Sequence, residues 1–414
     1  PLSFPDRGMA WRQLLDERPA EHRGRHAERS AALGENAPLI TILALAQDPD
    51  GIANAIADAA GQIYERWELI HAGPESEGGD PRIRAATGDP LALARGSHIL
   101  PLPPGVRLRP HALLEFALTV RAARGARVIF ADEAIGSGED DLVPVFKPAW
   151  SPIAGTARDL VGAPVLLDAA ALREASGLGP GEPGLAIADA VFRVAEAAGD
   201  TGVLHLAKVL AHRPAAASSE GWDRVAQARI ARTGMAVAVE RGAGGSLRLV
   251  PHPPVKPRVS IIIPTRDRAD LLRLSVGSLL TRSADPGLEI IVVDNGSVEE
   301  ETKALFASWD GEPRIRVLSA PGAFNFSRLN NLAVREARGE VVILFNNDVE
   351  ALDGDWLGEM AGWAALPEVG CVGAKLIYPD GAIQHAGVTP GVGHVFKRQP
   401  RDADGPAGRL ASLS

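Results

Sequence analysis

The sequence predicts an α/β protein in which short parallel strands alternate with helices. Two observations predict this fold class. Apolar runs of strand length occupy residues 289–294 and 340–346, and stretches with the leucine spacing of a helix, such as residues 271–280, lie between such runs. The runs are far shorter than the roughly 18 consecutive apolar residues that a membrane span needs. They therefore predict buried strands.

Length and composition are those of a globular protein with more than one domain. The chain has 414 residues, of which 46% are hydrophobic and 23% charged, and its formal net charge is −9. At roughly 100 to 200 residues per domain, this length predicts two or three domains. The acidic balance argues against nonspecific nucleic-acid binding. The single cysteine, Cys371, cannot form an internal disulfide and no secretion signal follows Pro1, so we expect a cytoplasmic protein.

The elements follow one another in a recognisable order. Residues 1–36 are rich in Arg, Glu, His and Ala and predict a helical N-terminal arm. From Pro38 the pattern becomes strand, helix, strand over residues 39–45, 52–63 and 67–70, which is a βαβ opening. A glycine-rich segment at 242–246, followed by four prolines up to Pro257, predicts a linker. We therefore expect an arm (1–36), a first α/β domain (37–250) and a second one (251–414).

The two halves begin alike. The aligned positions are Pro38 with Pro257, Asp48 with Asp267, Glu68 with Glu289, and Gly96 with Gly339. Gly96 and Gly339 are both turn glycines that enter an apolar strand. Two unrelated βαβ units in tandem also match in this way, so these residues alone leave duplication and chance equally open.

Polar residues follow three strands of the second half. Strand 259–263 runs into Pro264–Arg268, strand 289–293 ends at Asp294, and strand 341–345 ends in Asn346-Asn347-Asp348. Ligands of open α/β sheets bind at the carboxyl ends of strands. Two structural alternatives stay open here: Asp267 caps the helix that follows it, and Asp294-Asn-Gly is an ordinary turn.

These segments together resemble the family 2 glycosyltransferases, inverting enzymes with the GT-A nucleotide-sugar fold. The nearest subgroup makes bacterial O-antigen and cell-surface polysaccharide, and its members are often described as rhamnosyltransferases. The segments that carry the resemblance are Ser260–Arg268, Ile291–Ser297, Phe324–Asn331, Phe345–Glu350 and Gly370–Tyr378 with Ile383–Gly387.

The resemblance implies a role for each matching position. Pro264, Thr265, Arg266 and Asp267 would line the nucleotide pocket, and Asp294, with Asn295 beside it, would contact the base. Asp348 would bind a divalent metal, Mg or Mn. The remaining donor-site positions are Asn330 and Asn331, where the family commonly has Arg-Asn, and Asn346 and Asn347, where Asn346 replaces the first Asp of the Asp-x-Asp motif.

The first half resembles the leading domain of two-domain members of the family, with its chemistry lost. When the two halves are aligned with Gly96 opposite Gly339, Asn346 is aligned with Pro103, Asp348 with Gly105, and Asp294 with Gly73. In the region of the family's general base only Glu182 and Asp189 remain. Asp132 and Glu133 are either a polar pocket or, more commonly for two adjacent carboxylates after a strand, a solvated turn. We therefore expect two tandem GT-A domains, the first degenerate and the second truncated.

The implied reaction transfers a sugar from a UDP or dTDP donor to a growing glycan or lipid-linked glycan acceptor. Inverting transfer needs a carboxylate base. By the offset in the first copy, this base would fall about 80 residues after Asn346, beyond Ser414, so no catalytic residue is assigned. The alternative is a nucleotide-binding or scaffold module without turnover. Lipid-linked acceptors would bring such an enzyme to the inner face of the cytoplasmic membrane as a peripheral protein.

Overall fold

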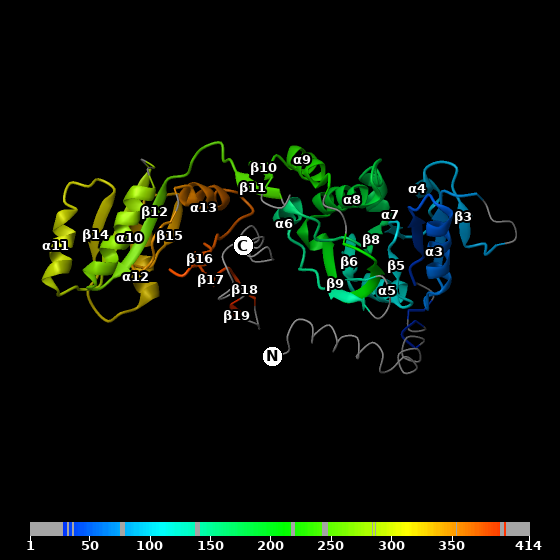
Figure 1. Cartoon of the computed structure of the whole chain (residues 1–414), viewed down its shortest axis with the longest axis horizontal. Helices are drawn as coiled ribbons and strands as arrows, with labels where there is room; N and C mark the ends of the chain where they lie inside the picture. The colour runs from blue at the N-terminus through cyan, green and yellow to red at the C-terminus, as the bar shows by residue number, and fades with distance from the viewer. Residues whose placement is uncertain are drawn as a thin grey trace. The chain divides into compact units, whose positions relative to one another are not determined.

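The computed structural model describes residues 28–30, 33–34, 37–74, 79–136, 141–216, 220–241, 247–283, 285, 287–352, 354–389 and 393–394. Most of the predicted arm therefore lies outside the described residues, although residues 28–30 are helical. The chain forms two compact units: residues 1–233 with 241–247, and residues 234–240 with 248–414 (Figure 1). Both units combine helices with a sheet, which confirms the α/β fold class.

The first unit is built on a nine-stranded mixed sheet with the order β3-β2-β1-β4-β8-β6-β9-β5, in which β7 also pairs with β6. Strands β1 to β4 are parallel, whereas β8 runs antiparallel to both β4 and β6. The strands are β1 (Ile40–Ala44), β2 (Trp67–His71), β3 (Ile83–Ala85), β4 (His98–Leu102), β5 (Arg107–Leu108), β6 (Val128–Ile135), β7 (Val143–Val145), β8 (Val165–Asp168) and β9 (Val203–Arg213).

Helices cover both faces of this sheet. One hydrophobic cluster packs α3 and α5 against it, and a second packs α4, α7 and α8 against the opposite face. The helices of the unit are α3 (Pro49–Ala60), α4 (Pro90–Leu93), α5 (Ala112–Ala122), α6 (Pro152–Ala157), α7 (Ala169–Glu174), α8 (Pro183–Ala198) and α9 (Trp222–Thr233). Helix α3 begins where the Asp48 side chain accepts the Gly51 backbone N–H at 2.7 Å, with Pro49 in its first turn.

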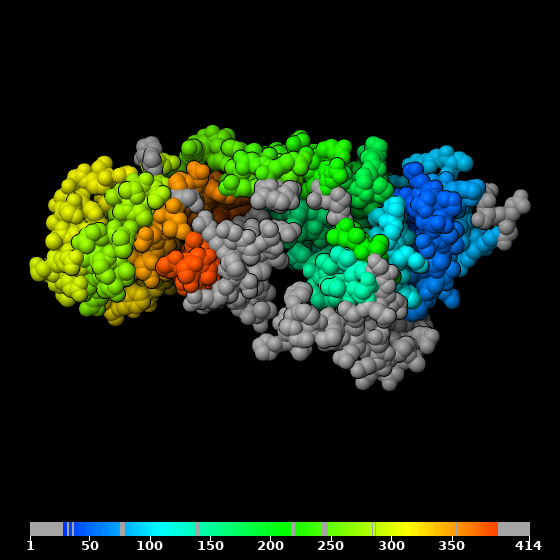
Figure 2. Space-filling view, viewed as in Figure 1, coloured from blue at the N-terminus to red at the C-terminus, as the bar shows by residue number. Residues whose placement is uncertain are grey.

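The second unit has a four-stranded parallel sheet with the order β14-β13-β12-β15. Helices α10, α11 and α13 pack on one face and α12 on the other. Helices α10 and α11 lie side by side on the surface (Figure 2). Its main elements are β12 (Val259–Thr265), α10 (Ala269–Arg282), β13 (Leu288–Asp294), α11 (Glu300–Ser308), β14 (Ile315–Ser319), α12 (Phe326–Glu336), β15 (Val341–Leu344) and α13 (Trp356–Ala364).

Short strands complete the second unit. The pairs β16 (Leu376–Ile377) with β17 (Ile383–His385) and β18 (Val388–Thr389) with β19 (Gly393–His394) are antiparallel. Strands β10 (Val237–Arg241) and β11 (Leu247–Pro251) form a two-stranded sheet where the sequence predicted a linker. The glycine-rich part of the predicted linker, residues 242–246, lies outside the described residues, and a boundary between the two units falls between Leu247 and Arg248. Within β11, Leu249 is buried and Pro251 packs against α13 at Gly362, where a Cβ would lie 2.8 Å from the proline ring.

The same hydrogen-bonded group of side chains occurs near the amino ends of the strands in both units. We call it the entry network: Thr41, Glu68, Arg84 and Gly96 in the first unit, and Ser260, Glu289, Arg316 and Gly339 in the second. In each, a hydroxyl on the first strand donates to the carboxylate on the second at 2.7 Å, and the arginine donates to that carboxylate at 2.6 Å. The glycine N–H donates to the hydroxyl at 3.0 Å and 2.9 Å, respectively.

At Gly96 and Gly339, the two glycines that precede β4 and β15, a larger residue would clash with neighbouring backbone. A Cβ on Gly96 would lie 2.8 Å from the Leu39 carbonyl oxygen, and one on Gly339 would lie 2.5 Å from the Ser260 backbone nitrogen. The strand orders β3-β2-β1-β4 and β14-β13-β12-β15 are also equivalent. These shared features support the repeat that the sequence alone left open.

Candidate donor site

Parallel pairing brings the three predicted strand ends to one edge of the second sheet. Thr265 of β12 lies opposite Asp294 of β13, and Leu344 of β15 lies opposite Ile262 of β12. Beyond β15 the chain turns back toward β12, because the Asn347 Nδ2 donates to the Thr265 Oγ1 at 3.1 Å. Residues from the first and third predicted segments are therefore in direct contact.

Asp267 has a structural partner that the sequence did not suggest. Its Oδ1 accepts the backbone N–H groups of Val298 at 2.8 Å and Glu299 at 2.9 Å, just before α11. These two hydrogen bonds, that from Glu299 foremost, lower the pKa of the Asp267 carboxyl. The alternative that it caps the helix behind it is wrong, since α10 has no side-chain cap bond. Asp267 joins the loops after β12 and β13, and it holds a left-handed backbone conformation, φ +54°, as does Arg268, φ +59°.

The Asp294 carboxylate keeps one oxygen for a ligand. Its Oδ1 accepts the Ser297 backbone N–H at 2.8 Å and the Ser297 Oγ at 2.6 Å, so the segment is indeed a turn, with Gly296 at φ +82°. Its Oδ2 accepts no hydrogen bond from the residues that the structure describes. The turn and the ligand role are compatible, because the turn fixes one oxygen and leaves the other.

Asn295 and Asn330 are buried, and their amides bind backbone. The Asn295 side chain is 1% exposed, and its Nδ2 donates to the carbonyl oxygens of Ala320 at 2.9 Å and Gly322 at 3.2 Å. The Asn330 side chain is 3% exposed, and its Nδ2 donates to the Phe326 carbonyl oxygen of its own helix at 2.8 Å. Asn331, the next residue of α12, is exposed. Of that pair, Asn331 is the one that a ligand can reach.

The third segment supplies an open set of oxygen donors. Asn346, Asp348 and Glu350 are exposed, and no group of three His, Cys, Asp or Glu side chains converges anywhere in the described part of the chain. Carboxylate and amide oxygens suit a hard cation, and Mg²⁺ is commonly held by one or two carboxylates together with waters and substrate phosphates. The residues fit a metal of that kind, which a diphosphate would help to hold.

At the aligned positions of the first unit these donors are missing. Gly73, Pro103 and Gly105 have no side-chain donor or acceptor, and the Gly73 N–H is bound to the Nδ1 of the buried His71 at 3.0 Å. The two acids of the predicted base region have structural partners. Glu182 caps α8 by accepting the Leu185 N–H at 2.8 Å, and Asp189 pairs with Arg193 and Arg232.

Asp132 and Glu133 do not form the solvated turn that the sequence favoured. They lie in β6, 2% and 3% exposed. Asp132 accepts the Lys147 backbone N–H and contacts His205 Nε2, both at 2.8 Å, while Arg213 donates to Glu133 at 2.8 Å. The Lys147 ammonium donates to three backbone carbonyl oxygens at 2.7 to 2.9 Å, and burial lowers its pKa. The structure therefore favours the other alternative, a polar pocket, although the sequence did not identify Lys147, His205 and Arg213 as the partners.

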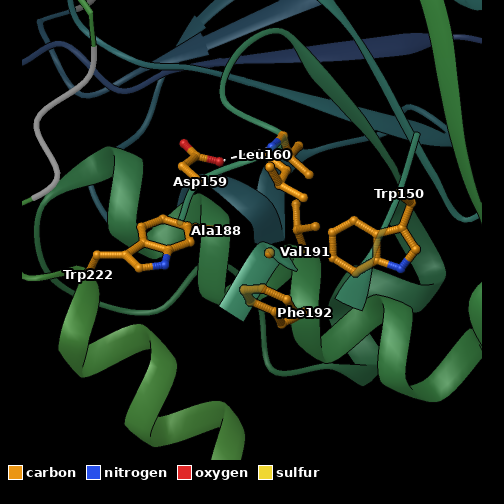
Figure 3. Close-up of a pocket in the computed structure, with 9 residues that line it drawn as sticks. Trp150, Asp159, Leu160, Ala188, Val191, Phe192 and Trp222 are labelled. Atoms are coloured by element: carbon orange, nitrogen blue, oxygen red, sulfur yellow. Dashed lines mark hydrogen bonds between the residues drawn. The ribbon is translucent and has the colours of Figure 1, made fainter. Parts of the chain in front are cut away.

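A small hollow lies next to this network. Trp150 and Trp222 face each other across it, with Val191 and Phe192 beneath and Asp159 at its rim (Figure 3). Its cavity volume is about 10 Å³, roughly enough for one water molecule. Pockets for drug-sized ligands commonly reach 300 to 1,000 Å³. The hollow is therefore too small for a nucleotide sugar.

The second unit is thus an α/β domain whose parallel strands end in a cluster of polar side chains suited to a nucleotide and a metal. Residues 260–401 match the family model described as glycosyl transferase family 2. The chain therefore contains a domain of glycosyl transferase family 2, as the resemblance predicted.

Two curated relatives align with nearly all of the chain. An uncharacterized protein, y4gI, of Sinorhizobium fredii is 36% identical over 402 residues, covering 87% of this chain and 44% of the relative. The O-antigen biosynthesis protein RfbC of Myxococcus xanthus is 32% identical over 418 residues, covering 90% of this chain and 32% of the relative. The chain spans less than half the length of either relative.

Similar solved structures include the mannosyltransferase PcManGT from Pyrobaculum calidifontis in complex with GDP-Man and Mn²⁺. It is 27% identical with a TM-score of 0.29, covering 31% of this chain and 38% of that one. S. aureus TarS 1–349 in complex with UDP-GlcNAc is 21% identical with a TM-score of 0.24, covering 26% and 31%. None of the helices in the described part of the chain has the length and apolar character needed to cross a membrane.

Proposed function

We propose that the second unit is the donor-binding half of an inverting glycosyltransferase that takes a UDP- or dTDP-sugar and extends a cell-surface polysaccharide or O-antigen. The observation that carries the proposal is the convergence of Thr265, Asp294 and Asn347 at one sheet edge within the family 2 domain. The similarity to an O-antigen biosynthesis protein supports the class of product.

Each group in the site has a distinct task. The free Oδ2 of Asp294 accepts the imide N–H of a uracil or thymine ring, a donor that cytosine lacks at this position. Asp348, with Asn346 and Glu350 near it in the chain, would hold Mg²⁺ or Mn²⁺, which neutralises charge on the departing diphosphate. Asn331 and Arg266 are exposed and available to the sugar and the phosphates.

The first unit, in this proposal, is a degenerate copy that has kept the fold and lost the donor site. Its Gly73, Pro103 and Gly105 supply neither the base contact nor the metal ligand. The acceptor is a glycan or lipid-linked glycan, so the protein works at the inner face of the cytoplasmic membrane as a peripheral component.

The test is calorimetric titration of the chain with UDP and dTDP, each with and without Mn²⁺. We expect binding that Mn²⁺ strengthens, and we expect Asp348→Ala to remove that strengthening while binding without metal stays unchanged. Asp294→Ala should weaken both nucleotides and leave the effect of Mn²⁺ intact. Asp310→Ala, two residues after the end of α11, is the control and should change neither. Failure of the unaltered chain to bind either nucleotide would refute the donor site.

A further inference from the structure

The loop that follows β14 is fixed to the strand end that holds Asp294. The Ala320 N–H donates to the Asp294 carbonyl oxygen at 2.8 Å, and the buried Asn295 amide donates to the carbonyl oxygens of Ala320 and Gly322. Arg328 of α12 donates to the same Ala320 oxygen at 3.3 Å. Hydrogen bonds of a buried side chain to backbone hold loop geometry firmly, because breaking them leaves unpaired polar atoms.

This loop carries an exposed aromatic ring. Phe324 is 68% exposed, the greatest exposure among the phenylalanines of the second unit's described residues, and it belongs to none of the hydrophobic clusters. Phe326, the first residue of α12, is 44% exposed. A single exposed apolar residue is ordinary. Phe324 differs because its loop is anchored on both sides: Gly322 is bound to Asn295, and the Asn325 side chain accepts the Arg328 N–H at 2.9 Å as the cap of α12.

The chain length between anchor and ring sets the reach of Phe324. Phe324 follows Gly322 by two residues, which span at most about 7 Å. Gly322 itself is bound to Asn295, the neighbour of Asp294. A nucleobase held at the free Oδ2 of Asp294 would therefore lie within reach of the Phe324 ring.

Resting on the donor site proposed above, we infer that Phe324 is the surface on which the pyrimidine base of the donor stacks. The ring offers a π-face and no hydrogen-bonding group, so it favours any pyrimidine, whereas Asp294 selects those with an imide N–H. Phe324 would thus provide affinity for the base, whereas Asp294 would determine which base binds.

The experiment titrates the full chain with UDP, and separately with inorganic pyrophosphate, in the presence of Mn²⁺. Stacking of one base on an aromatic side chain contributes about 1 to 3 kcal/mol, so Phe324→Ala should raise the Kd for UDP about 5- to 150-fold. Phe324→Tyr, which keeps the ring face, should stay within a few-fold of the unaltered protein. The Kd for pyrophosphate, which has no base, should not change.

The controls separate stacking from damage to the loop. Val298→Ala removes a 65% exposed apolar side chain from the loop that follows β13 and should leave the Kd for UDP unchanged. An equal loss of UDP and pyrophosphate binding in Phe324→Ala would mean a disturbed loop and would overturn the inference. Unchanged UDP affinity in Phe324→Ala, with normal binding by the unaltered chain, would overturn the stacking role and leave the donor site standing. Absence of binding by the unaltered chain would overturn both.

Discussion

Replacing Glu289 by Gln tests the entry network at its centre. The Glu289 carboxylate, 13% exposed, accepts hydrogen bonds from Ser260 Oγ, the Arg338 N–H and Arg316 Nη1 at 2.7, 3.0 and 2.6 Å. Glutamine keeps the shape but replaces one acceptor oxygen by an N–H₂ group that faces a donor. Losing one charge-assisted hydrogen bond costs about 1.5 to 3 kcal/mol, and an unpaired buried donor costs about 1 to 3 kcal/mol. Because Ser260 can rotate its hydroxyl to accept from the new N–H₂ group, we expect a loss in the lower part of the summed range, about 2.5 to 4 kcal/mol.

Urea unfolding of the full chain measures this loss, with amide hydrogen exchange used to assign it. The exchange of β12 and β13 amides should accelerate, while that of β1 and β2 amides in the first unit should not. Glu301→Gln, which alters a carboxylate that is 67% exposed and pairs with Arg273, is the matched control and should stay within about 0.5 kcal/mol. If Glu289→Gln destabilised no more than this control, the entry network would contribute nothing to stability and the reasoning would fail.

Three further outcomes follow from the same structure. Gly339→Ala should destabilise the second unit by about 1 to 3 kcal/mol or more, because its Cβ would meet backbone atoms. Gly277→Ala in α10, with open space around it, is the control and should be neutral or stabilising by up to about 1 kcal/mol. The urea concentration at the unfolding midpoint measures both effects. Burial alone would raise the pKa of Glu289, but hydrogen bonds from Ser260, the Arg338 N–H and Arg316 outweigh it and lower the pKa below 4.5, so its contribution is present above that pH and is lost as the pH falls through the lowered value. The urea midpoints of the unaltered protein and Glu289→Gln should therefore converge in acid, and a constant gap down to pH 2 would contradict this. Lys147→Met should cost the first unit about 3 to 5 kcal/mol by leaving Glu133 and three carbonyl groups with fewer partners, while Lys208→Met, at a 43% exposed side chain, should cost about 1 kcal/mol or less by thermal unfolding.

The parts of the fold that sequence predicts well are those set by local pattern. The strand expected at 39–45 is β1, Ile40–Ala44, and the one expected at 67–70 is β2, Trp67–His71, because apolar runs of strand length have few alternatives in a globular chain. Strand β11, which lies beside the expected linker, was not predicted because its pairing with β10 and its packing on α13 are not local.

The same distinction holds at the candidate site. The parallel topology predicted that polar residues would gather at the strand ends. It did not predict which residues those side chains would bind. Asp267 is bound to backbone 31 and 32 residues further on, and Asp132 lies beside His205, 73 residues away. In the sequence, a carboxylate in or after a strand looks the same whether it binds a ligand, holds a loop in place or contacts a buried basic side chain. Only its distant partners distinguish these cases.

The entry network and the proposed donor site lie at opposite ends of the same strands. Two separate selection pressures can therefore act on one sheet: the amino ends must keep their glycine and carboxylate for the protein to fold, whereas exposed residues at the carboxyl ends, such as Asp348, can be lost with little effect on the fold. A duplicated domain of this design is free to change its task after duplication. Such a domain is also a scaffold for protein engineering, because the loops after β1, β2 and β4 can be replaced while the opposite end of the sheet stays unchanged.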